Sequence, residues 1–282
     1  MATEHRYEEF VARNSGYINT TTQQAIRSCR LLIAGCGIGS GPAVCAARLG
    51  FENFILVDGD VVDRHNLNRQ FYDAADVGQP KVLALREKIL RINPAAEVQA
   101  HNVYLDASNT DDIVRQADVV FDTVDFLDLP AILRLHGSAR SHGRPVFTAL
   151  SVGFGALVWY FPANGGPGLA EVIAPDMAHF SGGVGEPSYA DVFGVFMQRL
   201  APFLDRQVVE QVGTVLRLMK EGRPCPASQV AVGSFAVGAM AMSMIHDLLA
   251  GNPLPAAPKL IVHSFKSHQT TVVDLGAADK AL

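Results

Sequence analysis

The strongest constraint on the fold is a short apolar segment that runs directly into closely spaced glycines. The sequence RLLIAGCGIGSG at 30–41 combines a buried-strand pattern with Gly35, Gly37 and Gly39, and a helical pattern follows that ends near Gly50. Backbone N–H groups at such a helix N-terminus can hold a phosphate. The glycines alone are compatible with any nucleotide-binding fold, and also with no ligand.

Strand patterns then alternate with helical patterns of roughly 10 to 15 residues. This alternation predicts an α/β fold with a doubly wound, mostly parallel Rossmann-like sheet. After Leu150 the alternation of strand and helix patterns ends. The sequence GFGALVWYFP at 153–162 predicts an additional strand beside PVFTAL at 145–150. Two further strand candidates, at 259–265 and 269–275, predict antiparallel C-terminal strands.

Four segments are expected around one core. They are an N-terminal arm at 1–29, a nucleotide-binding Rossmann-like core at 30–164, a helical insertion or crossover region at 165–224, and a C-terminal helix with strands at 225–282 that completes the same domain. The length of 282 residues fits one large or two modest domains.

Charge and composition limit the classes of partner. With 23 Lys and Arg against 28 Asp and Glu, the net charge is -5, so the field of the whole protein does not attract nucleic acid or anionic lipid. Two uncharged runs, at 145–170 and 224–245, are interrupted by Gly and Pro or built from small residues. A buried strand and a buried helix are therefore favoured over membrane spans.

The N-terminus and the cysteines indicate the compartment. MATEHRYEEF carries charges where a secretory signal needs an apolar core, and the four cysteines form no C-x-x-C pair. None of the nine histidines has metal-ligand spacing to a partner. We expect a cytoplasmic, reduced protein without zinc.

The second predicted strand ends in an acidic residue, Asp58, which lies 23 positions after Gly35. Nucleotide-binding folds place the carboxylate that holds the ribose at about this distance from the glycine loop. The two features together favour nucleotide binding over a structural loop.

The segment from Asp58 to Lys81, DGDVVDRHNLNRQFYDAADVGQPK, carries more polar side chains than an ordinary dehydrogenase needs. Five motifs follow one another in the chain: the glycine loop, D-x-D at 58–60, N-L-x-R-Q at 66–70, V-G-x-x-K at 77–81 and D-x-x-D at 122–125. This ordered set resembles the ubiquitin-activating-enzyme-like superfamily of ThiF, MoeB and HesA adenylyltransferases. The resemblance covers about residues 25–160 well and the C-terminal helix and strands more loosely.

The resemblance implies roles for the matching residues. Asp58 would hold the ribose of ATP, and three residues would contact its phosphates, namely Asn66, Arg69 and Lys81. Asp125 would hold Mg²⁺, directly or through water. Purely structural roles stay open for three of these residues. Arg69 could form an ion pair with Asp58, Lys81 could be a solvated first-turn residue, and Asp125 could cap the next helix.

Other residues are matched with less definite roles. Asp60 and Gln70 belong to the same motifs. Arg13 is the best match to an N-terminal arginine that reaches the ATP of the other protomer, with Arg6, Arg27 and Arg30 as nearby alternatives. Because that arginine acts in trans, and because the two uncharged runs offer surplus apolar surface, a homodimer is expected.

The sequence departs from the family pattern in three places. The glycine loop is one residue shorter, and Phe126 stands where an asparagine commonly follows the second Asp of D-x-x-D. The two C-x-x-C pairs of zinc-containing members are absent, and the insertion at about 165–224 replaces that region and with it the surface that selects the substrate. Cys225, between two prolines, lies where some members carry a catalytic cysteine; an inert loop cysteine is the alternative.

We therefore predict an ATP-dependent adenylyltransferase that converts a carboxylate into acyl-AMP and releases pyrophosphate. The substrate is the C-terminus of a small ubiquitin-like or sulfur-carrier protein or peptide, or a small-molecule carboxylate; a tRNA-borne carboxylate is disfavoured by the charge. Two rival hypotheses remain. One is an NAD(P)-dependent oxidoreductase that uses the same glycine loop, and the other is a pseudo-enzyme that dimerises with an active relative.

Overall fold

The computed structural model describes residues 6–126, 128–173, 189–221 and 228–278. One sheet of eight strands runs through this part of the chain, in the order β3-β2-β1-β4-β5-β6-β7-β8. The strands are β1 Arg30–Ala34, β2 Asn53–Val57, β3 Glu97–His101, β4 Val119–Asp122, β5 Val146–Ser151, β6 Gly155–Phe161, β7 Lys259–Ser264 and β8 Gln269–Asp274.

The first five strands are parallel and the last three are antiparallel. Apolar residues fill β1, β2 and β4 because helices cover both faces of a parallel sheet. The strand after Leu150 pairs with its predicted neighbour, since β6 lies antiparallel to β5 with Leu157 opposite Leu150. The predicted fold class is therefore confirmed.

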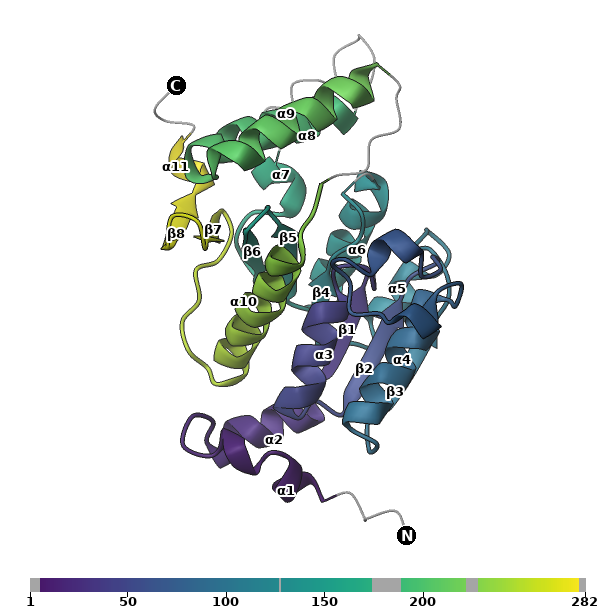
Figure 1. The fold of residues 1–282 in the computed structure, drawn as a ribbon. Coiled ribbons are helices and arrows are strands. Elements are labelled where there is room, and N and C mark those ends of the chain that lie inside the picture. The colour runs from purple at the N-terminus through teal and green to yellow at the C-terminus, as the bar shows by residue number, and fades with distance from the viewer. Residues whose placement is uncertain (1–5, 127, 174–188, 222–227, 279–282) are drawn as a thin grey trace.

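Helices cover both faces of the sheet (Figure 1). The α-helices are α1 Tyr7–Phe10, α2 Thr20–Ser28, α3 Ser40–Leu49, α4 Lys81–Ile92, α5 Thr110–Val114, α6 Leu129–Ser141, α7 Leu169–Ile173, α8 Tyr189–Leu200, α9 Arg206–Lys220, α10 Ala231–Leu249 and α11 Leu275–Ala278. Short 3₁₀ turns occupy Ala12–Asn14, Arg64–Asn66, Ala74–Asp76 and Ala201–Phe203. Residues of α2, α3, α4 and α10 contribute to one core cluster, and those of α5 to α8 to the cluster on the other face.

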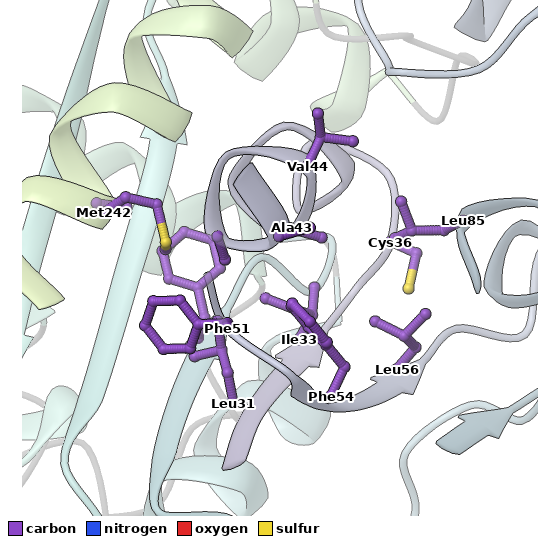
Figure 2. Packing of buried hydrophobic residues seen from close by; sticks show 14 of the residues in the cluster. Leu31, Ile33, Cys36, Ala43, Val44, Phe51, Phe54, Leu56, Leu85 and Met242 are labelled. Carbon is purple, nitrogen blue, oxygen red and sulfur yellow. The ribbon is translucent and has the colours of Figure 1, made fainter. Parts of the chain in front are cut away.

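The first core cluster contains the cysteine of the glycine loop. Cys36 is fully buried in the same cluster as Leu56 of β2 and Leu85 of α4, and Figure 2 shows its sulfur among these side chains. Burial raises the pKa of the Cys36 thiol well above its usual range. Cys36 is therefore a packing residue of this core.

Helix α10 lies against α3, β5 and β6, and its small residues allow a close approach. A Cβ atom at Gly238 would stand 3.3 Å from the backbone of Gly41 in α3. By length and composition α10 is the one helix in the described ranges that could span a membrane, with a mean hydropathy of 1.4, and half of that window is buried in the fold. The core helix of a soluble protein can meet the same criteria of length and hydropathy.

The helical insertion completes the second face of the sheet. Phe196 of α8 is fully buried, and its ring lies 4.9 Å from that of Trp159 in β6, centroid to centroid. Helix α9 follows α8 across a 3₁₀ turn and lies alongside it (Figure 1). The insertion therefore shares a hydrophobic core with the sheet.

Candidate nucleotide site at the carboxyl edge of the sheet

The candidate site lies where the strand order changes direction. Strand β1 pairs with β2 on one side and with β4 on the other, and the chain leaves these neighbours toward opposite faces. The carboxyl ends of β1 and β4 are therefore at the usual ligand position of doubly wound sheets, and we call this region the crevice. The glycine loop follows β1, the D-x-D motif follows β2, and the D-x-x-D motif follows β4.

The glycines of the loop are required by their surroundings. Gly35 has a φ of +86°, and a Cβ there would overlap the carbonyl oxygen of Thr123. A Cβ at Gly39 would overlap the carbonyl oxygen of Gly35. The Thr123 hydroxyl donates to the Gly35 carbonyl oxygen over 2.7 Å, which fastens the loop to the D-x-x-D turn.

Gly37 faces the motif that contains Gln70. A Cβ at Gly37 would stand 3.1 Å from Gln70 Nε2. Gln70 is buried, and within the described residues its Oε1 atom has no hydrogen-bond partner. An amide oxygen only accepts hydrogen bonds, so this atom calls for a donor and does not itself bind phosphate. The side-chain-free backbone of Gly37 is the part of this contact that fits a phosphate-bearing ligand.

Asp58 joins the glycine loop to the segment after β2. Its Oδ2 accepts the Cys36 N–H over 2.7 Å and its Oδ1 accepts the Asp60 N–H over 2.8 Å. Burial raises the pKa of the Asp58 carboxyl, and the charge of Lys81 and these two N–H groups oppose that shift. The predicted ribose carboxylate is thus built into the wall of the crevice, and no ion pair with Arg69 occurs in the described structure.

Lys81 and Asp60 form an ion pair inside this wall. The Lys81 ammonium lies 2.7 Å from Asp60 Oδ2, and Lys81 is only 6% exposed although it begins α4. The interpretation of Lys81 as a solvated residue is therefore wrong. The other oxygen of Asp60 accepts a hydrogen bond of 2.6 Å from the Tyr104 hydroxyl. No sequence motif pointed to Tyr104, which follows β3.

Arg69 is held by a residue from the other half of the chain. Its Nε donates to Gln229 Oε1, just ahead of α10, and its guanidinium also donates to the carbonyl oxygen of His65 over 2.8 Å. Burial lowers the pKa of Arg69. Gln229 was missed because no local pattern connects it to a residue 160 positions away.

Asn66 has a local structural contact. It is buried, and its side-chain Oδ1 accepts the Asp63 N–H over 2.9 Å in a capping box of the 3₁₀ turn. Asn66, the first residue of the N-L-x-R-Q segment, thus shapes the turn that carries Arg69.

The D-x-x-D turn separates a buried from an exposed carboxylate. Asp122 is buried and accepts hydrogen bonds from the Val124 N–H and the Thr148 hydroxyl, with His136 Nε2 at 3.1 Å. Asp125 is exposed at the carboxyl edge. The following helix is capped by Asp128, whose side chain accepts the Ala131 N–H, so the interpretation of Asp125 as its cap is wrong.

Phe126 turns away from the crevice. It is buried, and its ring lies 5.0 Å from that of Phe193 and 5.9 Å from that of Phe196, both in α8. The residue that replaces the family's asparagine therefore ties the D-x-x-D turn to the helical insertion.

Arg13 lies away from the crevice. It is exposed in the 3₁₀ turn of the N-terminal arm. The neighbouring Asn14 donates to the carbonyl oxygen of Leu49, at the far end of α3 from the glycine loop, and α3 is about 15 Å long. Cys225 lies outside the described residues.

Magnesium would find an oxygen ligand at Asp125. Mg²⁺ commonly binds proteins through one or two carboxylates together with substrate phosphates, so one exposed carboxylate beside a phosphate cradle fits. Within the described ranges no group of three or more His, Cys, Asp or Glu side chains is placed to hold a metal ion by itself.

The fold and the crevice define a class, a nucleotide-binding α/β protein with a glycine cradle at the switch point of its sheet. The profile of the ThiF family matches residues 11–281. The chain therefore belongs to the ThiF family, and the resemblance inferred from the ordered motifs is confirmed.

Relatives and solved structures agree with this assignment. Over 105 residues the chain is 35% identical to a probable molybdopterin-synthase adenylyltransferase of Porphyra purpurea, a match that covers 36% of this chain and 28% of that protein. It is 36% identical over 105 residues to the molybdopterin-synthase adenylyltransferase of Escherichia coli K12, covering 36% of this chain and 42% of the relative. The chain thus spans less than half the length of each relative.

The structure of E. coli MccB with ATP is similar at a TM-score of 0.67, over 97% of this chain and 72% of that chain. The two sequences are 16% identical, so this similarity describes the fold.

Proposed function

We propose that this protein is an ATP-dependent adenylyltransferase that converts a substrate carboxylate into acyl-AMP. The observation that carries the proposal is the convergence of the glycine loop, Asp58, Lys81 and the D-x-x-D turn on one crevice. Membership of the ThiF family and the names of the two adenylyltransferase relatives support it.

The proposed reaction needs little proton transfer. A carboxylic acid with an ordinary pKa is ionised at neutral pH, so its oxygen can attack the α-phosphorus of ATP without a general base. A bond forms between that oxygen and the α-phosphorus, the bond to the bridging oxygen of the β-phosphate breaks, and pyrophosphate leaves. The main requirement is cationic stabilisation of a crowded anion held in line.

The side chains of the crevice meet this requirement. In our proposal the loop N–H groups and the cations Arg69 and Lys81 hold the phosphates, while Asp58 accepts the ribose hydroxyls. Asp125 would hold Mg²⁺, which supplies charge neutralisation at the phosphate oxygens. Asn66 supports the segment that carries Arg69.

We propose the C-terminus of a small protein or peptide as the substrate, ahead of a small-molecule carboxylate. Both adenylyltransferase relatives are named for a protein, molybdopterin synthase. The helical insertion is the segment that we assign to substrate selection, since Phe126, next to Asp125, packs against α8.

ATP–pyrophosphate exchange tests the proposal. The purified chain with Mg²⁺ is assayed against small proteins ending in Gly-Gly, short peptides with free C-termini, and small carboxylic acids. We expect exchange with one of these classes and no tight binding of NADH. Tight NADH binding without ATP binding would establish the oxidoreductase instead, and ATP binding without exchange by any class would favour the pseudo-enzyme.

A further inference from the structure

Tyr104 is an exposed tyrosine with a fixed hydroxyl. It lies in the segment that follows β3, and 65% of its surface is exposed. Its ring packs over the backbone of Gly59, where a Cβ atom would stand 2.7 Å from the ring, and its hydroxyl donates to Asp60 Oδ1 over 2.6 Å. An exposed tyrosine ordinarily has several rotamers, so this arrangement restricts a side chain that gains little from burial.

Asp60 bridges Tyr104 and Lys81. One carboxylate oxygen accepts the tyrosine hydroxyl and the other lies 2.7 Å from the Lys81 ammonium. Burial alone would raise the pKa of Asp60, but the hydrogen bonds from Lys81 and Tyr104 outweigh it and lower the pKa. Asp60 therefore remains a carboxylate that holds both neighbours, with Asp58 as the other acidic group nearby.

The contact with Asp60 restricts the Lys81 ammonium, which would otherwise be mobile. A lysine ammonium is a point charge on a flexible four-carbon stem with three donors. An Asp60 oxygen that occupies one donor fixes the position of the Lys81 nitrogen and leaves two donors for a ligand. We propose that Tyr104 is a positioning residue that acts through Asp60 to hold the Lys81 ammonium where it meets the phosphates of the nucleotide. This inference rests on the proposed function.

A direct test compares two tyrosine variants. Tyr104→Phe keeps the ring over Gly59 and removes only the hydroxyl. Tyr160→Phe is the matched control, because Tyr160 stacks on Phe147 near the amino end of β5, at the opposite edge of the sheet. Binding of the non-hydrolysable analogue AMPCPP with Mg²⁺ is measured by calorimetry. We expect Tyr104→Phe to bind about fivefold more weakly, the value of one net hydrogen bond, and Tyr160→Phe to bind as the unaltered protein does.

Two further measurements separate positioning from a structural or direct role. Adenosine lacks phosphates, so its affinity, measured by ligand-observed NMR, should be unchanged in Tyr104→Phe if the tyrosine acts through Lys81. In a double-mutant cycle, Tyr104→Phe should have no further effect on AMPCPP binding once Asp60→Ala has removed the bridge. Circular dichroism confirms that each variant is folded.

Four results would overturn the inference. AMPCPP affinity could be unchanged in Tyr104→Phe, adenosine affinity could fall equally, or the tyrosine effect could persist in the Asp60→Ala background. In these three cases the unaltered protein still binds AMPCPP, and the proposed function stands. Failure of the unaltered protein to bind AMPCPP would remove the proposed function and the positioning role together.

Discussion

Arg69 donates from Nε to Oε1 of Gln229 over 2.5 Å, which connects residues 160 positions apart. Asn68 strengthens this junction, since its amide donates to the carbonyl oxygen of Gln229 over 3.3 Å. The start of α10 is thereby fastened to the N-L-x-R-Q segment beside the glycine loop. A cation that we assign to the phosphates is thus aligned by the segment that leads into α10.

The junction should contribute measurably to stability. Gln229→Ala removes an acceptor for a charged donor that is partly buried, and we expect the free energy of unfolding to fall by about 1 kcal/mol. Gln229→Glu keeps an acceptor oxygen and should retain the stability. Urea unfolding of the two variants provides the comparison, and an equal loss in both would show that the guanidinium contact contributes nothing.

The two aspartates around the D-x-x-D turn should have separable effects. Asp125→Ala removes the proposed magnesium ligand and should lower ATP–pyrophosphate exchange by about 10²-fold, with little change in stability. Asp128→Ala removes the α6 cap and should lower the free energy of unfolding by about 1 kcal/mol with exchange largely retained. Reversed effects of the two variants would contradict this assignment.

The glycine loop should tolerate no side chain at Gly35. Gly35→Ala and Gly78→Ala both place alanine at a positive φ, +86° and +88°, but only the Cβ at Gly35 overlaps the Thr123 carbonyl, whereas nothing lies within 4 Å at Gly78. We expect Gly35→Ala to be about 2 kcal/mol less stable than Gly78→Ala, because strain adds to the shared backbone cost. Thermal unfolding measures the difference, and equal stabilities would mean that the loop relaxes freely.

Arg13 should act on the partner's site in a homodimer. Sedimentation is expected to show a dimer at micromolar concentration, and Arg13→Ala and Arg69→Ala should each be inactive in exchange. Mixed in equal amounts and allowed to re-associate, the two variants should recover about one quarter of the original activity, because half of the dimers then contain one intact site. A fully active monomer, or no recovery on mixing, would remove the trans role.

Cys225 should be required after adenylation if it carries the acyl group or its sulfur. Cys225→Ser is then expected to retain ATP–pyrophosphate exchange and to lose transfer to the final acceptor, since a hydroxyl does not replace a thiolate in that step. Cys45→Ser is a control for general thiol loss. Unimpaired transfer by Cys225→Ser would show that a soluble nucleophile takes the acyl group directly.

The fold class could be predicted because its signals are local. Apolar runs such as RLLIA and the glycines after it specify a buried strand and a turn through interactions within a few residues. The order of strands follows from the alternation with helices and the right-handed crossover between parallel strands. The motifs also located most of the crevice, since the carboxyl ends of neighbouring parallel strands meet at one edge.

The sequence by itself therefore determined the sheet, the glycine cradle and the family. Tertiary structure decided the partners of the side chains around the site: Lys81 pairs with Asp60, Arg69 with Gln229, and Phe126 packs on α8. These contacts join segments far apart in the chain, so no local sequence pattern predicts them. Their geometry arises only when burial of the two hydrophobic cores brings the edges of the sheet and its helices together.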